Sequence, residues 1–173
     1  MSDIKNKKPE IEEVISAVLS GDEQKNALNF VAYLRENKLN PKWSATNAWT
    51  VSHKTFRVCF IRLSGAADYH NLEAGTWHIL PFIGEYETTS LDDKLKDIVW
   101  ANKKPCQTCN QCALQLSNIF GKKFDTACEG SIVFINPDSE GLDCAKKLVE
   151  LRKNAIKEGS AKKHVYVAIK DRK

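Results

Sequence analysis

The chain has 173 residues, of which 42% are hydrophobic and 28% are charged, and its net charge is +4. This length suits one domain, and the composition excludes collagen-like, low-complexity and wholly disordered chains. No apolar run approaches the roughly 18 residues of a membrane span, and the first ten residues lack the apolar core of a signal peptide, so we expect a cytoplasmic protein.

Two helices are predicted near the start of the chain. The apolar positions within 11–19 repeat with the spacing of one helix face, and so do those within 27–34. Ser20 is expected to cap the second helix, with Asp22 as a competing cap. Asn37 is expected to end that helix in a left-handed conformation.

Three strands are predicted next, because the period of the apolar residues changes to two after Trp43. They cover 48–53, 55–63 and 75–82, and a tight turn joins the first two as a hairpin. The strand at 55–63 is apolar on both faces, so we expect it at the centre of a sheet. Pro81 indicates that the third strand ends at an edge or a bulge.

The second half of the chain is predicted to add two helices and two strands. One helix begins at Ser90 with Asp93 as its capping carboxylate, and a short apolar strand covers 131–135. The next helix has Pro137 at its first position. A last strand covers 165–169.

The expected fold class is therefore α+β, with an antiparallel sheet covered by helices on one face. The order is α-α-β-β-β-α-(Cys insertion)-β-α-β. We predict a single domain over 1–173, with a flexible tail at 1–9 and a cysteine-containing insertion at 102–129.

Four of the six cysteines carry the most concentrated chemistry of the sequence. Cys106, Cys109 and Cys112 form a C-x2-C-x2-C run, and Cys128 follows sixteen positions later. A C-x2-C turn lets two thiolates converge on one ion, and four thiolates complete the tetrahedron of a structural zinc site. An iron–sulfur cluster is an alternative, although the residues after Cys112 and Cys128 depart from the ferredoxin pattern. Free or redox-active thiols are a further alternative.

The other two cysteines are predicted to be small buried hydrophobic residues. Cys59 lies on a predicted strand and Cys144 on a predicted helix. Cys144 stays open as a substitute for Cys128 in the ligand set. A reducing compartment disfavours a disulfide framework.

A small-ligand site is a second hypothesis of a different class. Trp43, Trp49 and Trp77 fall in or beside strands, with His78 next to the last of them. These side chains could line a pocket on an exposed sheet face, or they could fill the core. A sensor or binding module would follow from the first arrangement.

The remaining candidates point away from catalysis. His78 with Glu85 and Glu87 could bind a cation or do acid–base chemistry, whereas His53 is expected to be solvated in its turn. The sequence contains no phosphate-binding glycine loop, nucleophile elbow or His-Glu-x-x-His motif. Its lysine pairs lack a nucleic-acid motif, so a solvated face is expected there. We expect a non-enzymatic protein that binds metal, with no nucleic acid and no membrane as partner.

The order of elements resembles that of small bacterial α+β domains of unknown function, the YdhG-like group. The resemblance is carried by two paired helical segments, the tryptophan-containing hairpin from Lys42 through Trp49, the strand ending at Leu63 and the run 145–153. It covers about 22–157 and implies the α+β architecture. It implies no catalytic residue, and the cysteine segment lies outside it.

Overall fold

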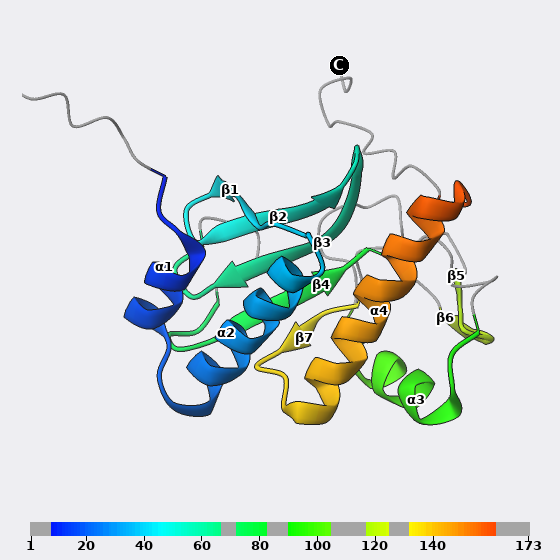
Figure 1. Ribbon diagram of the computed structural model, residues 1–173. Coiled ribbons are helices and arrows are strands. Elements are labelled where there is room, and N and C mark those ends of the chain that lie inside the picture. The colour runs from blue at the N-terminus through cyan, green and yellow to red at the C-terminus, as the bar shows by residue number, and fades with distance from the viewer. Residues whose placement is uncertain (1–7, 67–71, 83–89, 105–116, 125–131, 162–173) are drawn as a thin grey trace, which may run out of the picture.

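The computed structural model describes residues 8–66, 72–82, 90–104, 117–124 and 132–161. These residues form an α+β fold, in which helices lie across an antiparallel sheet (Figure 1). In chain order the elements are α1 (Ile11–Val18), α2 (Gly21–Glu36), β1 (Lys42–Ala45), β2 (Ala48–His53), β3 (Phe56–Leu63), β4 (Trp77–Pro81), α3 (Asp93–Ala101), β5 (Ser117–Ile119), β6 (Lys122–Phe124), β7 (Phe134–Ile135) and α4 (Ser139–Glu158).

The main sheet has the strand order β1-β2-β3-β4-β7, and every neighbouring pair is antiparallel. The strand β3 is central, as its two apolar faces predicted. Cross-strand partners share a face, and one row runs from Trp49 through Ile61 and Ile79 to Phe134. All four side chains are at most 1% exposed. This row therefore forms the floor of the core.

The helices cover this face of the sheet. The ring of Trp77 on β4 lies 6.3 Å from that of Phe30 on α2. The hydroxyl of Tyr33 on α2 donates to the carbonyl of Lys146 on α4 at 3.0 Å, and α4 contacts β3, β4 and β7. Figure 1 shows α2 and α4 side by side, while α1 packs on α2 and α3 packs on α4. The predicted one-sided layer of helices is confirmed for these elements.

The helices α3 and α4 begin three and two residues later than predicted. Asp92 caps α3, and Asp93 is the first residue of that helix. Asp138 caps α4, so Pro137 lies just outside the helix. Each capping carboxylate accepts from the backbone N–H three residues on, at 3.0 and 2.8 Å. Within the described residues the side chain of Ser20 makes no capping hydrogen bond to α2.

The predicted insertion at 102–129 contains regular structure that the sequence pattern did not indicate. The strands β5 and β6 form a separate two-stranded hairpin there. The strand predicted at 131–135 is shorter in the structure, where β7 covers two residues. The strand predicted at 165–169 and the first part of the tail at 1–7 lie outside the described residues. No helix that the structure describes is long and apolar enough to cross a membrane.

Candidate functional site

The four predicted metal ligands, Cys106, Cys109, Cys112 and Cys128, lie outside the described residues. Elsewhere in the chain, as far as the structure describes it, no three His, Cys, Asp or Glu side chains gather as a metal site would require. The structure does show where the backbone enters and leaves the two cysteine-bearing segments. These points of attachment limit where the cysteines can lie.

The first attachment joins the two ends of the insertion. Lys103 and Ile132 form an antiparallel β-bridge, and the N–H of Val133 donates to the carbonyl of Asn102 at 2.9 Å. Ile132 is fully buried in the core. The chain is therefore held together at a point three residues before Cys106 and four residues after Cys128.

The second attachment is the β5–β6 hairpin, whose first and last residues, Ser117 and Phe124, are paired. Its two-residue loop has positive φ at Phe120 (50°) and Gly121 (89°), as a type I′ turn requires. The side chain of Asn118 accepts from the N–H of Gly121 at 2.8 Å and closes the turn. The hairpin therefore holds its two ends side by side.

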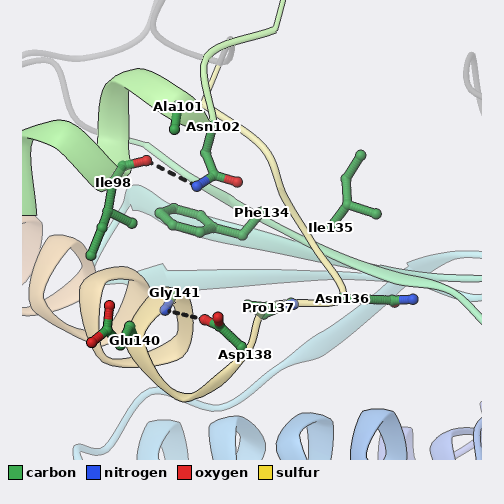
Figure 2. Close-up of a pocket in the computed structure, with 10 residues that line it drawn as sticks. All are labelled: Ile98, Ala101, Asn102, Phe134, Ile135, Asn136, Pro137, Asp138, Glu140 and Gly141. Carbon is green, nitrogen blue, oxygen red and sulfur yellow. Dashed lines mark hydrogen bonds between the residues drawn. The ribbon is translucent and has the colours of Figure 1, made fainter.

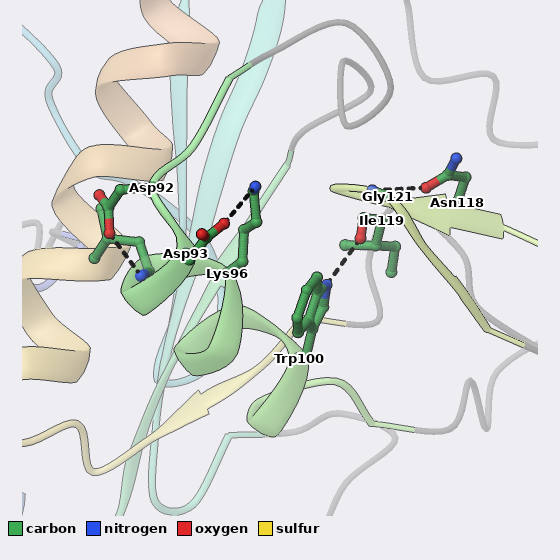
Figure 3. Close-up of polar contacts among 8 residues, drawn as sticks. Asp92, Asp93, Lys96, Trp100, Asn118, Ile119 and Gly121 are labelled. Carbon is green, nitrogen blue, oxygen red and sulfur yellow. Dashed lines mark hydrogen bonds and ion pairs between the residues drawn. The ribbon is translucent and has the colours of Figure 1, made fainter.

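The hairpin is fixed to the body of the domain through α3. The indole N–H of Trp100 donates to the carbonyl of Ile119 at 2.8 Å, which Figure 3 shows. Ile119 is fully buried and Phe120 is 5% exposed, and both belong to the core. The hairpin is thus a packed part of the fold, and it gives the insertion a second rigid end.

Two chain segments run between these attachments, and we call them the cysteine arms: residues 104–116 and residues 125–131. The first arm carries Cys106, Cys109 and Cys112, and the second carries Cys128. Cys128 is the fourth residue after Phe124 and the fourth before Ile132, and four residues span at most about 14 Å of extended chain. All four cysteines therefore belong to one closed ring of backbone.

Lysines add positive charge at the base of this ring. The ammonium groups of Lys103 and Lys122 lie 5.3 and 5.4 Å from the centre of the Phe124 ring, where the second arm begins. Lys122 also lies 5.0 Å from the centre of the Trp100 ring. The aromatic faces hold both cations in place, and cations at this position favour ionised thiols nearby.

Substitution of Gly121 tests the hairpin. Its φ of +89° is unfavourable for residues with a Cβ, although a Cβ would meet nothing within 4 Å. Gly121→Ala is expected to destabilise the hairpin by about 1–2 kcal/mol through backbone strain alone. Gly121→Asn should cost less, because Asn tolerates the left-handed region. Hydrogen exchange of the β5 and β6 amides measures both, and equal protection in Gly121→Ala and the wild type would contradict the assigned turn.

The two remaining cysteines are buried and unreactive, as predicted. Cys59 on β3 and Cys144 on α4 are fully buried free thiols. Burial raises the pKa of Cys59 well above its usual range and that of Cys144 to about 12. The Cys144 thiol lies 3.7 Å from the carbonyl of Leu95 on α3. Cys144 thus belongs to the α3–α4 contact, where burial opposes the thiolate that a metal requires.

The candidates for a small-ligand site do not share one surface. Trp49 and Trp77 are at most 1% exposed and face the helices, and Trp43, which is paired with Trp49, is half-buried against the same core. His78 follows Trp77 directly on β4, so its side chain points to the opposite face. Trp49 and Trp77 therefore fill the core and cannot line an open sheet face. The carboxylates predicted beside His78 fall within 83–89, outside the described residues.

A pocket of about 350 Å³ lies where α3 ends and α4 begins (Figure 2). Ile98 and Phe134 line it, and Ile135 beside them is 45% exposed. Its polar side chains already have partners. Asn102 donates to the carbonyl of Ile98 at 2.9 Å and Asp138 caps α4, while Asn136 accepts from the N–H of Trp77 and Glu140 pairs with Lys94. The pocket therefore gives no reason to assign a ligand.

His53 is not solvated in the way its position near a turn predicted. It is the last residue of β2 and half-buried, and its Nε2 is buried with no hydrogen-bond partner among the described residues. Burial lowers the pKa of His53 most, and the positive charges of Lys153, Lys54 and Lys157 lower it further. The folded protein therefore favours the neutral form of the His53 imidazole.

The lowered pKa of His53 predicts a pH-dependent contribution to stability. The unfolded chain binds a proton near pH 6.5, whereas the folded state resists it. The wild type should therefore lose stability as the pH falls through 6.5, until the pH reaches the lower pKa of the folded state. Urea unfolding of the wild type and of His53→Gln at two pH values, one above and one below 6.5, isolates this loss. The stability advantage of the wild type over the variant should shrink at the lower pH, and a constant difference would contradict the assignment.

Comparisons with protein-family models, with curated proteins and with solved structures returned no match.

Proposed function

We propose that this chain is a non-enzymatic, metal-binding protein in which Cys106, Cys109, Cys112 and Cys128 hold one structural zinc ion. The observation that carries the proposal is the pairing of the residues that flank the two cysteine arms, which closes the ring. The chain places its four closely spaced thiols in segments whose ends are paired at Lys103–Ile132 and at the base of the hairpin. A tetrahedral site needs ligands from segments that are brought together, and this ring supplies them.

The energetics of the arms support a metal at this place. Ordering a residue costs about 1–2 kcal/mol of conformational free energy. The paired ends lower that cost, because the loops are already closed by the Lys103–Ile132 bridge and by the hairpin. Metal coordination by several thiolates contributes roughly 10–16 kcal/mol in small zinc domains at neutral pH. The ion would thus offset a large part of the cost of ordering both arms.

The charge distribution supports the same ligand set. Four thiolates around Zn²⁺ leave a net charge of −2, which nearby cations stabilise. Lys103 and Lys122 are held over Phe124, at the origin of the second arm. The competing thiols of Cys59 and Cys144 are buried with raised pKa values. The reactive thiol chemistry therefore belongs to the four cysteines of the arms.

The metal content of protein purified without oxygen tests the proposal. We expect about one zinc per chain in the wild type, and little zinc in Cys109→Ser, since serine is a poor zinc ligand at neutral pH. Cys144→Ala is the matched control, because it removes a thiol from the core. This control should lower stability and keep its zinc.

Three results would contradict the proposed site. A metal-free wild type whose four arm thiols react freely would show that the cysteines do not coordinate. Loss of zinc from Cys144→Ala in folded protein would place Cys144 in the ligand set. Iron with acid-labile sulfide in place of zinc would identify an iron–sulfur cluster in the same ring.

A further inference from the structure

The face of the main sheet that points away from the helices carries charged and aromatic side chains. The row that begins at Trp49 points to the helices, so its neighbours along each strand point to the opposite face, which we call the outer face. One row of the outer face runs from Lys42 through Thr50 and Phe60 to Leu80. Along this row Leu80 is 7% exposed, Phe60 and Thr50 are half-buried, and Lys42 is exposed. The outer face is therefore accessible on β1, β2 and β3.

Two arginine side chains of β3 lie beside one aromatic ring on the outer face. The guanidinium carbons of Arg57 and Arg62 lie 5.5 and 5.6 Å from the centre of the Phe60 ring. Arg62 reaches the outer face because it follows Phe60 at the next position of the same face of β3. Arg57 reaches it through a β-bulge, since the register shifts beside Ser52, with which Arg57 is paired. The Phe82 ring lies 5.0 Å from that of Phe60 in a T-shaped contact and holds it in place.

These side chains form one surface, which we call the outer platform. Printed along three neighbouring strands, it combines a half-buried aromatic ring with flanking cations and hydroxyl groups. It consists of Lys42, Thr50, Ser52, Arg57, Phe60 and Arg62. Contact with the ring restricts both guanidinium groups to positions beside it. The platform is thus arranged by the register of the sheet before any ligand binds.

The charge of the outer platform has one sign. Its ionised side chains are Lys42, Arg57 and Arg62, and the five described strands of the main sheet contain no Asp or Glu. The whole chain has 22 Asp and Glu against 26 Lys and Arg, so this composition is particular to the sheet. A face that only keeps the protein in solution carries both signs. Shielding of Phe60 from water explains one arginine, but neither the second arginine nor the lack of carboxylates in these strands.

We propose that the outer platform binds single-stranded nucleic acid, with one base stacked on Phe60 and its flanking guanidinium groups. An aromatic ring on an antiparallel sheet offers a stacking surface for an unpaired base. The planar guanidinium group stacks on rings and donates in pairs to phosphate oxygens, so Arg57 and Arg62 suit both parts of a nucleotide. Lys42 adds a third phosphate contact at the edge of the sheet. An unpaired base is required, because a duplex buries the faces of its bases.

The sequence predicted no nucleic-acid partner, because its lysine pairs accompany no known motif. The outer platform uses other residues, which the register brings together from different strands. An acidic protein is the main alternative partner, since it would match the charge. Charge matching alone gives no use for the ring that lies beside both arginines, and the observations therefore favour a nucleic acid.

Fluorescence anisotropy of a labelled oligodeoxythymidylate of about 12 nucleotides tests the proposal with the full chain at low salt. With three phosphate contacts, the logarithm of the affinity should fall against the logarithm of the salt concentration with a slope of about −2. Arg57→Gln and Arg62→Gln should each weaken binding at least about fivefold and make this slope shallower by about 0.7. Phe60→Leu should weaken binding at least about fivefold with the slope unchanged, because it removes stacking and no charge.

Lys25→Gln is the matched control, since it removes an exposed cation near the start of α2, in the helix layer. It should leave the affinity within about twofold of the wild type, because the charge it removes makes no phosphate contact. Circular dichroism verifies that each variant is folded, and the exposed position of Arg57 makes Arg57→Gln the variant that keeps the test valid if Arg62→Gln folds poorly.

Four results would overturn the proposal. Folded wild-type protein that shows no saturable binding of the oligonucleotide has no such site. Equal weakening by Arg57→Gln and Lys25→Gln would show a response to net charge alone. Equal affinity for a duplex would show attraction to phosphates without a stacked base. Equal affinity for polyglutamate of the same charge would make the outer platform a contact surface for acidic proteins.

Discussion

Replacing Trp77 with alanine is expected to lower the free energy of unfolding by about 3–5 kcal/mol, as truncation of a buried aromatic side chain does. Trp77 is fully buried and packs against Phe30, so the variant leaves a cavity between β4 and α2. Urea denaturation followed by far-ultraviolet circular dichroism measures the loss.

A second variant separates packing from any polar role of the indole. The Nε1 of Trp77 is buried and has no hydrogen-bond partner among the described residues. Trp77→Phe keeps most of the apolar contact and removes this uncompensated N–H, so it should cost much less than alanine. A loss below about 1 kcal/mol for Trp77→Ala would contradict the core placement, since buried large-to-small changes cost more than that.

Removing the proposed zinc ion is expected to open the insertion while the rest of the domain stays folded. The helices α2 and α4 and the main sheet share a core that is formed by residues outside the cysteine arms, as far as the structure describes the chain. The β5–β6 hairpin packs on the core through Ile119 and Phe120 and accepts a hydrogen bond from Trp100, whereas its two ends continue into the arms. A chelator should therefore reduce the exchange protection of residues 117–124 at least tenfold, which corresponds to about 1.4 kcal/mol.

Native-state hydrogen exchange with and without chelator measures this difference. Amides in the middle of α4 should keep their protection, and the Cys109→Ser variant should show the open hairpin before any chelator is added. Unchanged protection of the hairpin in a protein shown to have lost its metal would contradict the structural role. Unfolding of α4 together with the hairpin would show that the core depends on the ion after all.

The strands of the main sheet could be predicted because alternation and turn residues are local signals. The apolar residues on both faces of the predicted strand indicated a central position for β3. The structure agrees, because Cys59 and Ile61 on one face and Val58 on the other are all buried. Pro81 predicted an edge or a bulge, and it is paired with Cys59 at a point that β7 does not reach, because β7 pairs with His78 and Ile79. The missing N–H of proline therefore costs no ladder hydrogen bond on that side.

The hairpin could not be predicted from periodicity, because each of its strands has three residues. Its only local signal was the two-residue turn, and Phe120 is an unusual residue in a left-handed conformation. Burial of Phe120 and the hydrogen bond from Trp100 to Ile119 support that conformation, and both depend on the tertiary fold. The shifted helix starts have a simpler cause: Asp92 and Asp138 stand next to residues that could also begin a helix.

For the candidate sites too, features set by neighbouring residues could be predicted from the sequence, and features set by long-range contacts could not. The spacing of the cysteines could be read directly, whereas the ring depends on the pairing of Lys103 with Ile132, which are far apart in the sequence. For the tryptophans, the sequence could not distinguish a ligand surface from a core, because aromatic residues on strands suit both. Only their burial in the structure distinguishes the two placements.

Native mass spectrometry of protein purified without oxygen decides whether the folded chain holds the proposed zinc ion. We expect that the folded chain carries one zinc ion, that the bound form has lost thiol protons to the coordination, and that Cys109→Ser appears as the metal-free chain. A folded wild-type chain found only at the mass of the fully protonated, metal-free protein would contradict it.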